Sequence, residues 1–326
     1  MGKIKARIKN VDIRPFREVN LLVSPLMFDD MPVKIKVYPF TMGDEIQIYS
    51  SIKSIIEDKT PNKLFGSFEI FIELAQRVLD EDFIEEYFDK LTLFDLEWII
   101  YNSRMLTHGN IMEGTWTCTS CANKYKNINE IDEHLRKNPI VVRFVNNGFK
   151  TDFEYDLSKF QLKFPNSKDE VRKELKLSNI RLILSYPTIE RHNVLYKVLD
   201  DYRLYEGLIK EVEGEKYLNK LKEDKEMYDI IYYMFQMYAF YSMYIEEIEI
   251  DGKLEKVELD DYPYLAGLLL KELSNEDKKI LEDEINKLSE NTQIISLNEV
   301  TCPVCGRRDV IPYSFFLGNF LFASNR

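Results

Sequence analysis

Two short stretches of sequence decide how this chain is organised: Thr117-Cys118-Thr119-Ser120-Cys121 and Thr301-Cys302-Pro303-Val304-Cys305-Gly306. Together they contain all four cysteines of the chain. A C-x-x-C turn presents two thiolates to one metal ion, and two such turns complete a tetrahedral Cys₄ zinc site, which is usually structural. The sequence therefore predicts one zinc ion that joins the middle of the chain to its C-terminal end. Its ligands would be Cys118, Cys121, Cys302 and Cys305.

Other uses of these cysteines stay open, because each pair could also be a redox dithiol or a disulfide. A redox pair should begin a helix after a strand. Short strand-like segments instead flank both turns, at 115–117 and 124–126 around the first and at 300–301 and 310–311 around the second, which favours a zinc ribbon. His134 follows Cys121 at zinc-finger spacing, but residues 138–140 contain no second histidine to complete such a finger.

Composition indicates a globular protein with an acidic surface. The 326 residues are 45% hydrophobic and 31% charged, with a formal net charge of −12, so no overall field attracts a phosphate backbone. Four cysteines at metal spacing, without an apparent leader, indicate a reducing compartment. The longest uncharged stretch, 230–245, is short and rich in tyrosine, so we expect a buried helix and no membrane span.

The order of local signals predicts a mainly α fold with small antiparallel β hairpins, an α+β class organised by the discontinuous Cys₄ zinc ribbon. We expect four segments. These are an N-terminal arm (1–20), a strand and helices ending in the first C-x-x-C turn, or zinc knuckle (21–138), a hairpin and helical insertion (139–260), and helices with the second knuckle and an aromatic tail (261–326).

Several local patterns support these elements. The alternating residues 33–38 predict a half-buried strand, and Asn146-Asn147-Gly148 and Asp251-Gly252 each predict a hairpin turn. The ranges 167–184 and 187–200 are interpreted as helices, and 202–247 as a helical zone broken near Gly207 and Gly214. Three capping pairs predict helix starts: Thr41 with Asp44, Thr92 with Asp95, and Ser274 with Asp277.

No catalytic constellation is found, since the sequence has no phosphate loop, nucleophile elbow or metal-protease helix. Arg307 and Arg308 would contact phosphates in a nucleic-acid-binding ribbon, but solvent or partner contacts in a structural one. The apolar tail either packs on its own core or anchors a neighbouring subunit, and the Tyr-rich zone 228–244 has the same two interpretations. The tail residues predicted to bind a partner are Phe315, Phe316, Phe320 and Phe322.

Spaced motifs across the chain resemble the baseplate hub and baseplate-assembly proteins of contractile-tailed, T-even-type bacteriophages. The first group is Ser24-Pro25, the strand 33–38 and Pro39-Phe40-Thr41-Met42-Gly43-Asp44-Glu45. The second is Leu91, Asp95, Ser103-Arg104, Gly109, Cys118 and Cys121, and the third is Cys302-Pro303-Val304-Cys305-Gly306 with Phe315-Phe316.

This resemblance implies a non-enzymatic structural or assembly component of a phage tail baseplate, stabilised by structural zinc. Its partners would be other baseplate and tail proteins, with no small-molecule substrate and no nucleic acid. It would be found in the host cytoplasm during assembly and in the tail of the virion. The alternative is a zinc-ribbon regulatory protein that binds nucleic acid.

Overall fold

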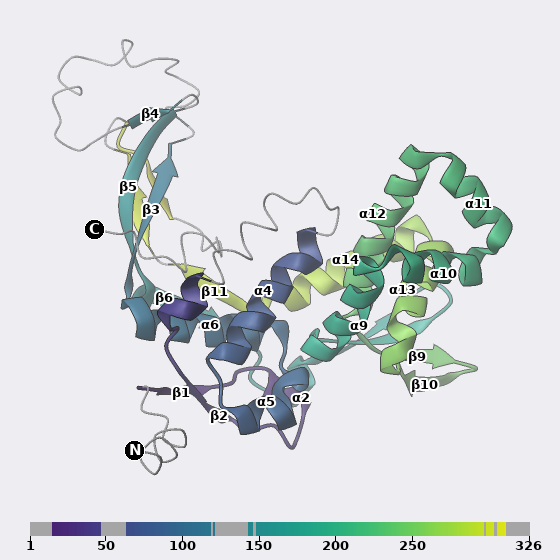
Figure 1. Ribbon diagram of the computed structural model, residues 1–326, viewed down its shortest axis with the longest axis horizontal. Coiled ribbons are helices and arrows are strands. Elements are labelled where there is room, and N and C mark those ends of the chain that lie inside the picture. The colour runs from purple at the N-terminus through teal and green to yellow at the C-terminus, as the bar shows by residue number, and fades with distance from the viewer. Residues whose placement is uncertain are drawn as a thin grey trace, which may run out of the picture. The chain divides into compact units, whose positions relative to one another are not determined.

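The computed structural model (Figure 1) describes residues 15–46, 63–118, 120, 143–145, 148–296, 298–302 and 305–310. The chain divides into two compact units, the first containing residues 1–103 and 164–293 and the second containing residues 104–163 and 294–326. Helices dominate and the small sheets are antiparallel, so the predicted α+β class is confirmed at this level. The division into four sequence segments stays a prediction.

The first unit begins with a two-stranded sheet around a short helix. β1 (Arg17–Asn20) pairs antiparallel with β2 (Lys34–Val37), and α2 (Ser24–Met27) lies between them in sequence. Along β2 the exposed Lys34 and Lys36 alternate with the buried Ile35 and Val37. This alternation confirms the strand predicted at 33–38, because successive side chains of a strand point to opposite faces.

A four-stranded sheet in the first unit corrects one prediction. Its order is β10-β9-β8-β7, with bounds Lys253–Lys256, Ile245–Ile250, Arg181–Ser185 and Arg172–Lys176. The predicted helix 167–184 is therefore wrong: only the 3₁₀ turn η4 (Lys168–Glu170) is helical there. The apolar spacing in this range suits either structure. Pairing between strands selects the β structure, because the buried Leu182 in β8 lies opposite Ile248 in β9, a partner far along the chain.

Helices form the rest of the first unit. Their bounds are α4 Lys63–Arg77, α5 Glu81–Tyr87, α6 Leu93–His108, α9 Ile189–Asp200, α10 Tyr202–Glu213, α11 Glu215–Glu223, α12 Lys225–Ser242, α13 Tyr262–Glu272 and α14 Asn275–Glu290. The short 3₁₀ turns η1 (Phe88–Lys90) and η5 (Leu259–Asp261) adjoin them, and α6 continues into the second unit. Gly214, with φ +89°, separates α10 from α11 as predicted, whereas Gly207 lies inside α10. No helix in the described ranges combines the length and apolarity that crossing a membrane requires.

All three predicted capping pairs form. The backbone N–H of Asp44, Asp95 and Asp277 donates to the hydroxyl of Thr41, Thr92 and Ser274 at 3.2, 3.2 and 3.1 Å respectively. Each aspartate carboxylate also accepts a hydrogen bond from another part of the first unit. Asp44 pairs with Arg77 at 3.2 Å, and Asp277 accepts from the backbone N–H of Ser178 at 2.9 Å. The capping residues thus also fix tertiary contacts.

Asp95 makes the largest of these tertiary contacts. Its fully buried carboxylate accepts hydrogen bonds from the backbone N–H groups of Leu22 (2.6 Å), Val23 (3.1 Å) and Ser24 (2.6 Å). The hydroxyls of Ser24 (2.6 Å) and Thr92 (3.1 Å) both donate to Oδ2 of Asp95. Consecutive N–H groups that converge on one carboxylate form an anion-binding concavity, so this residue fixes the segment between β1 and α2 against the start of α6.

The second unit consists of small sheets. β3 (Ile111–Thr117), β5 (Gly148–Asp156) and β4 (Arg143–Val145) form one sheet in the order β3-β5-β4. β6 (Phe160–Lys163), which follows the 3₁₀ turn η3 (Leu157–Lys159), pairs with β11 (Gln293–Ser296), and β12 (Glu299–Thr301) pairs with β13 (Arg308–Val310). β4 and β5 pair antiparallel, while residues 146 and 147 of the turn predicted between them lie outside the described residues. The hairpin β9–β10 confirms the turn predicted at Asp251-Gly252.

Candidate metal centre

The strands of the second unit bring cysteines from both knuckles together. Cys118 directly follows the end of β3, Cys302 directly follows β12, and Cys305 lies in the turn before β13. Their three Sγ atoms all lie within 4.8 Å of one another. The structure therefore joins Cys118 in the middle of the chain to the two cysteines near its end, as the sequence predicts. Cys121 lies outside the described residues.

The sulfur geometry fits a tetrahedral thiolate site. Sγ of Cys118 lies 3.7 Å from Sγ of Cys305. Zinc–sulfur bonds of about 2.3 Å at tetrahedral angles place neighbouring sulfurs about 3.8 Å apart. Cys118 and Cys302 are buried and Cys305 is exposed, so two of the three thiols lie inside the fold and one lies at its surface.

A tight turn shapes the second knuckle. The N–H of Cys302 donates to the carbonyl of Arg307 at 2.8 Å, and the N–H of Gly306 donates to the carbonyl of Cys302 at 2.9 Å. Gly306 has φ +72°, a left-handed conformation that L side chains rarely adopt. The glycine after the second cysteine therefore allows the chain to reverse from β12 into β13.

One arginine links the two knuckles. Nη1 of Arg307 donates to Oγ of Ser120 at 2.7 Å, and its Nε donates to a carboxylate oxygen of Asp309 at 3.0 Å. The sequence offered phosphate contact or a solvent and partner contact for this residue. The structure shows an internal contact instead, which connects the segment of the first C-x-x-C motif to the turn of the second.

The other predicted site residues have different outcomes. The tail residues Phe315, Phe316, Phe320 and Phe322 lie outside the described residues. In the Tyr-rich zone, Tyr232 and Tyr238 are buried in the first unit, whereas Tyr233 is 60% exposed. The inward face of α12 is therefore core, and only its outward face is accessible to a partner.

Sequence reasoning missed two features of the first unit. The contacts of Asp95 with residues 22–24 were not predicted, because the capping box accounted for this residue by itself. Arg191 was also missed, although a base in the first turn of a helix, where acids are favoured, was an available signal.

A comparison with protein-family models identifies the family of this chain. The family model described as "T4 bacteriophage base plate protein" matches residues 26–320, which include both knuckles and most of both units. Neither the comparison with curated proteins nor the comparison with solved structures found a match.

Proposed function

The chain belongs to the T4 bacteriophage base plate protein family, and from this premise we propose that it is a non-enzymatic structural component whose fold depends on a structural zinc ion. The match over residues 26–320 carries the baseplate assignment, because it covers nearly the whole chain and not one module. Family membership makes other phage tail proteins its partners and the tail baseplate its place in the particle.

The proposed zinc ion is held by Cys118, Cys121, Cys302 and Cys305. Three converging thiols, two of them buried, support this proposal, as does a sulfur separation of 3.7 Å. Four thiolates leave no open coordination position, so the ion would stabilise the fold and not activate water. Because a site of this kind rarely exists in the unfolded chain, the free energy of zinc binding also stabilises the folded state.

The proposal also includes how the protein enters the particle. It would be made in the host cytoplasm and join neighbouring tail proteins there through the tail residues Phe315, Phe316, Phe320 and Phe322. Interface cores favour aromatic side chains over charged ones, and the zinc-bound knuckle precedes this segment in sequence. A segment that starts at a rigid point loses less conformational entropy when it binds.

Metal analysis of the purified chain tests the zinc site. Native mass spectrometry should find one zinc ion per chain, and Cys305→Ser should lose the ion and lower the melting temperature. The matched control is Ser120→Ala, which alters the contact with Arg307 but removes no thiolate. A metal-free protein with four reactive thiols would overturn the site. Mass spectrometry of tail particles from infected cells tests the baseplate role independently, because a chain absent from assembled or assembling tails would contradict it.

A further inference from the structure

A polar pocket of about 430 Å³ lies within the first unit, far from the cysteines in sequence. It is lined by residues of α2, α9, α13 and the four-stranded sheet, and charged side chains predominate. Among them are Lys168, Arg172, Glu190, Arg191, Glu246 and Lys256. The volume lies within the range of pockets that bind small ligands, and one of the charged lining residues, Arg191, is almost fully buried.

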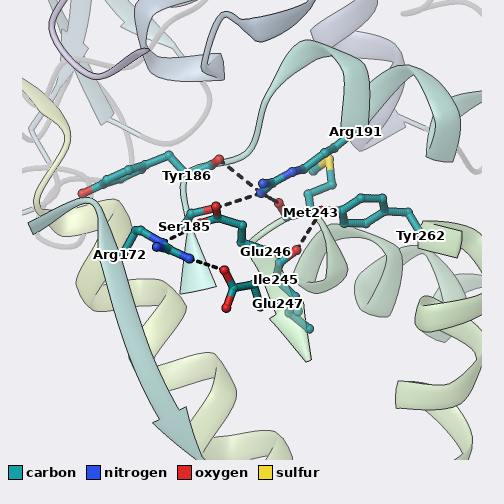
Figure 2. A network of polar contacts seen from close by, with 9 residues as sticks. All are labelled: Arg172, Ser185, Tyr186, Arg191, Met243, Ile245, Glu246, Glu247 and Tyr262. Carbon is teal, nitrogen blue, oxygen red and sulfur yellow. Dashed lines mark hydrogen bonds and ion pairs between the residues drawn. The ribbon is translucent and has the colours of Figure 1, made fainter. Parts of the chain in front are cut away.

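Arg191, in the first turn of α9, is only 4% exposed. Figure 2 shows that one end of its guanidinium group is fixed: Nη1 donates to Oγ of Ser185 at 2.9 Å, to the carbonyl of Met243 at 3.0 Å and to the carbonyl of Tyr186 at 3.5 Å. The group also lies over the ring of Tyr262, 5.6 Å from its centroid. These contacts hold the guanidinium group in one orientation.

No carboxylate in the described part of the chain forms an ion pair with this arginine, although the charge of Arg191 acts on the neighbouring carboxylate of Glu190. The nearby carboxylates of Glu246 and Glu247 pair with Arg172 instead, Glu246 at 3.0 Å. Two carbonyl groups and a hydroxyl only partly compensate a buried cation, because neutral acceptors bind a cation more weakly than an anion does. The uncapped N-terminus of α9, where Arg191 lies, adds further positive potential. A buried cation without an anion is costly, so the site is suited to an anion from outside.

The unused edge of the guanidinium group specifies which anion fits. Every hydrogen bond of Arg191 to a described residue uses Nη1. Nε and Nη2 have no acceptor there, yet neither belongs to the polar atoms that are sealed from solvent without a partner. Both nitrogens therefore retain access to the pocket. Two parallel N–H groups on one edge match the two oxygens of a carboxylate.

We propose that this pocket binds a carboxylate group, received bidentately by Nε and Nη2 of Arg191 and supplied by an acidic side chain of a neighbouring tail protein. The identity of the neighbour as a tail protein rests on the proposed function, whereas recognition of the carboxylate rests on the pocket alone. The ring of Tyr262 and the partners of Nη1 position the receptor before the ligand arrives, which reduces the entropy cost of binding.

The lining of the pocket contains four basic and five acidic side chains, most of which are paired with one another or exposed to solvent. Asp29 pairs with Lys168, so neither adds a free charge. Lys256 makes no ion pair with a described residue and adds a second cation to the lining. Glu190 also lines the pocket: burial raises the pKa of its carboxyl, while the nearby charges of Arg191 and Lys256 lower it. The remaining acids in the lining, Asp169 and Glu258, are exposed, where solvent and salt screen them.

The test uses the full zinc-loaded chain with ¹⁵N-labelled arginine. Succinate is titrated while the side-chain Nε–H signals are followed by NMR, and the Arg191 signal is assigned by its loss in Arg191→Lys. Succinamide, which has the same shape without charge, is the ligand control. Arg203→Lys is the matched variant control, because the side chain of Arg203 is 89% exposed and pairs with Asp201. A second arm replaces succinate by a glutamate-containing peptide and its glutamine counterpart.

The expected result is a saturable shift of the Arg191 Nε–H signal with succinate and no shift with succinamide. Arg191→Lys should weaken succinate binding about tenfold or more, since lysine cannot form the bidentate contact, and Arg203→Lys should not. Tighter binding of the glutamate peptide than of succinate supports a neighbouring protein as the source, and succinate binding alone supports a free acid in the same site.

Two results would overturn the site: an unmoved Arg191 signal with both ligands, or an equal shift with sodium chloride at matched ionic strength. If Arg191→Lys does not fold, the titration of the unmodified chain still decides between these outcomes. Zinc content and presence in tail particles are measured separately, so a failure of the carboxylate site is distinguishable from a failure of the proposed function.

Discussion

Replacing Asp95 by Asn tests whether one buried carboxylate holds the segment before α2 against the start of α6. The carboxylate accepts from five donors at 2.6–3.1 Å and is fully buried. Asparagine keeps the shape, but its amide nitrogen would face N–H and O–H groups that also donate. Several charge-assisted hydrogen bonds would be lost and buried donors would be left without an acceptor.

The structure sets the magnitude of this effect. A hydrogen bond to a charged group contributes about 1.5–3 kcal/mol, and such losses are not additive. We therefore expect Asp95→Asn to lower the free energy of unfolding by roughly 3–5 kcal/mol, the cost of disrupting a buried charged network. For a chain of this size that corresponds to a fall in melting temperature of about 5–15 °C.

Urea unfolding followed by circular dichroism at pH 7, together with thermal scans, measures this change. The matched control is Asp224→Asn, because Asp224 is exposed and its carboxylate caps α12 by accepting from the N–H of Met227 at 3.0 Å. Asparagine caps helices as well as aspartate does, so this variant should change stability by less than about 0.5 kcal/mol. If Asp95→Asn loses less than about 1 kcal/mol, the carboxylate is not the anchor inferred from its contacts.

Three further variants test other features. Burial raises the pKa of Glu97 to about 7. Ionisation of this carboxyl therefore lowers the free energy of unfolding, an effect that is absent below pH 4.5 and complete above pH 7. Glu97→Gln should raise the free energy of unfolding measured in urea by about 1–3 kcal/mol at pH 8 and should not change it at pH 4. Hydrogen bonds from Ser178 lower the pKa of Asp277. The ionised carboxylate therefore stabilises the folded state fully above pH 3.8, and this contribution is lost as pH falls through the lowered pKa. The free energies of unfolding of wild type and Asp277→Asn, measured in urea, should differ at pH 7 and converge near pH 2. Gly306→Ala, at φ +72°, should cost about 1–2 kcal/mol and weaken zinc retention in a chelator competition; unchanged retention would contradict the role given to the turn.

The sequence by itself determined the features that depend on neighbouring residues. The capping pairs, the hairpin turn at Asp251-Gly252 and the end of α10 at Gly214 follow from hydrogen bonds or backbone conformations within a few positions. The two C-x-x-C motifs also predicted that Cys118, Cys302 and Cys305 approach one another, because thiolates at this spacing are typical ligands of one metal ion. Short spaced motifs were enough to indicate the family, which the match over residues 26–320 confirms.

Only the tertiary structure decided which distant groups each local element meets. The carboxylate of Asp95 accepts from residues 71–73 positions away, and the range 167–184 forms strands because β8 pairs with β9. Arg191 has one guanidinium end fixed by Met243 and the other directed to a pocket, an asymmetry that its neighbours in sequence do not contain. Local hydrogen bonds are limited to a few residues, whereas burial selects partners from the whole chain, so burial settles what the local pattern leaves ambiguous.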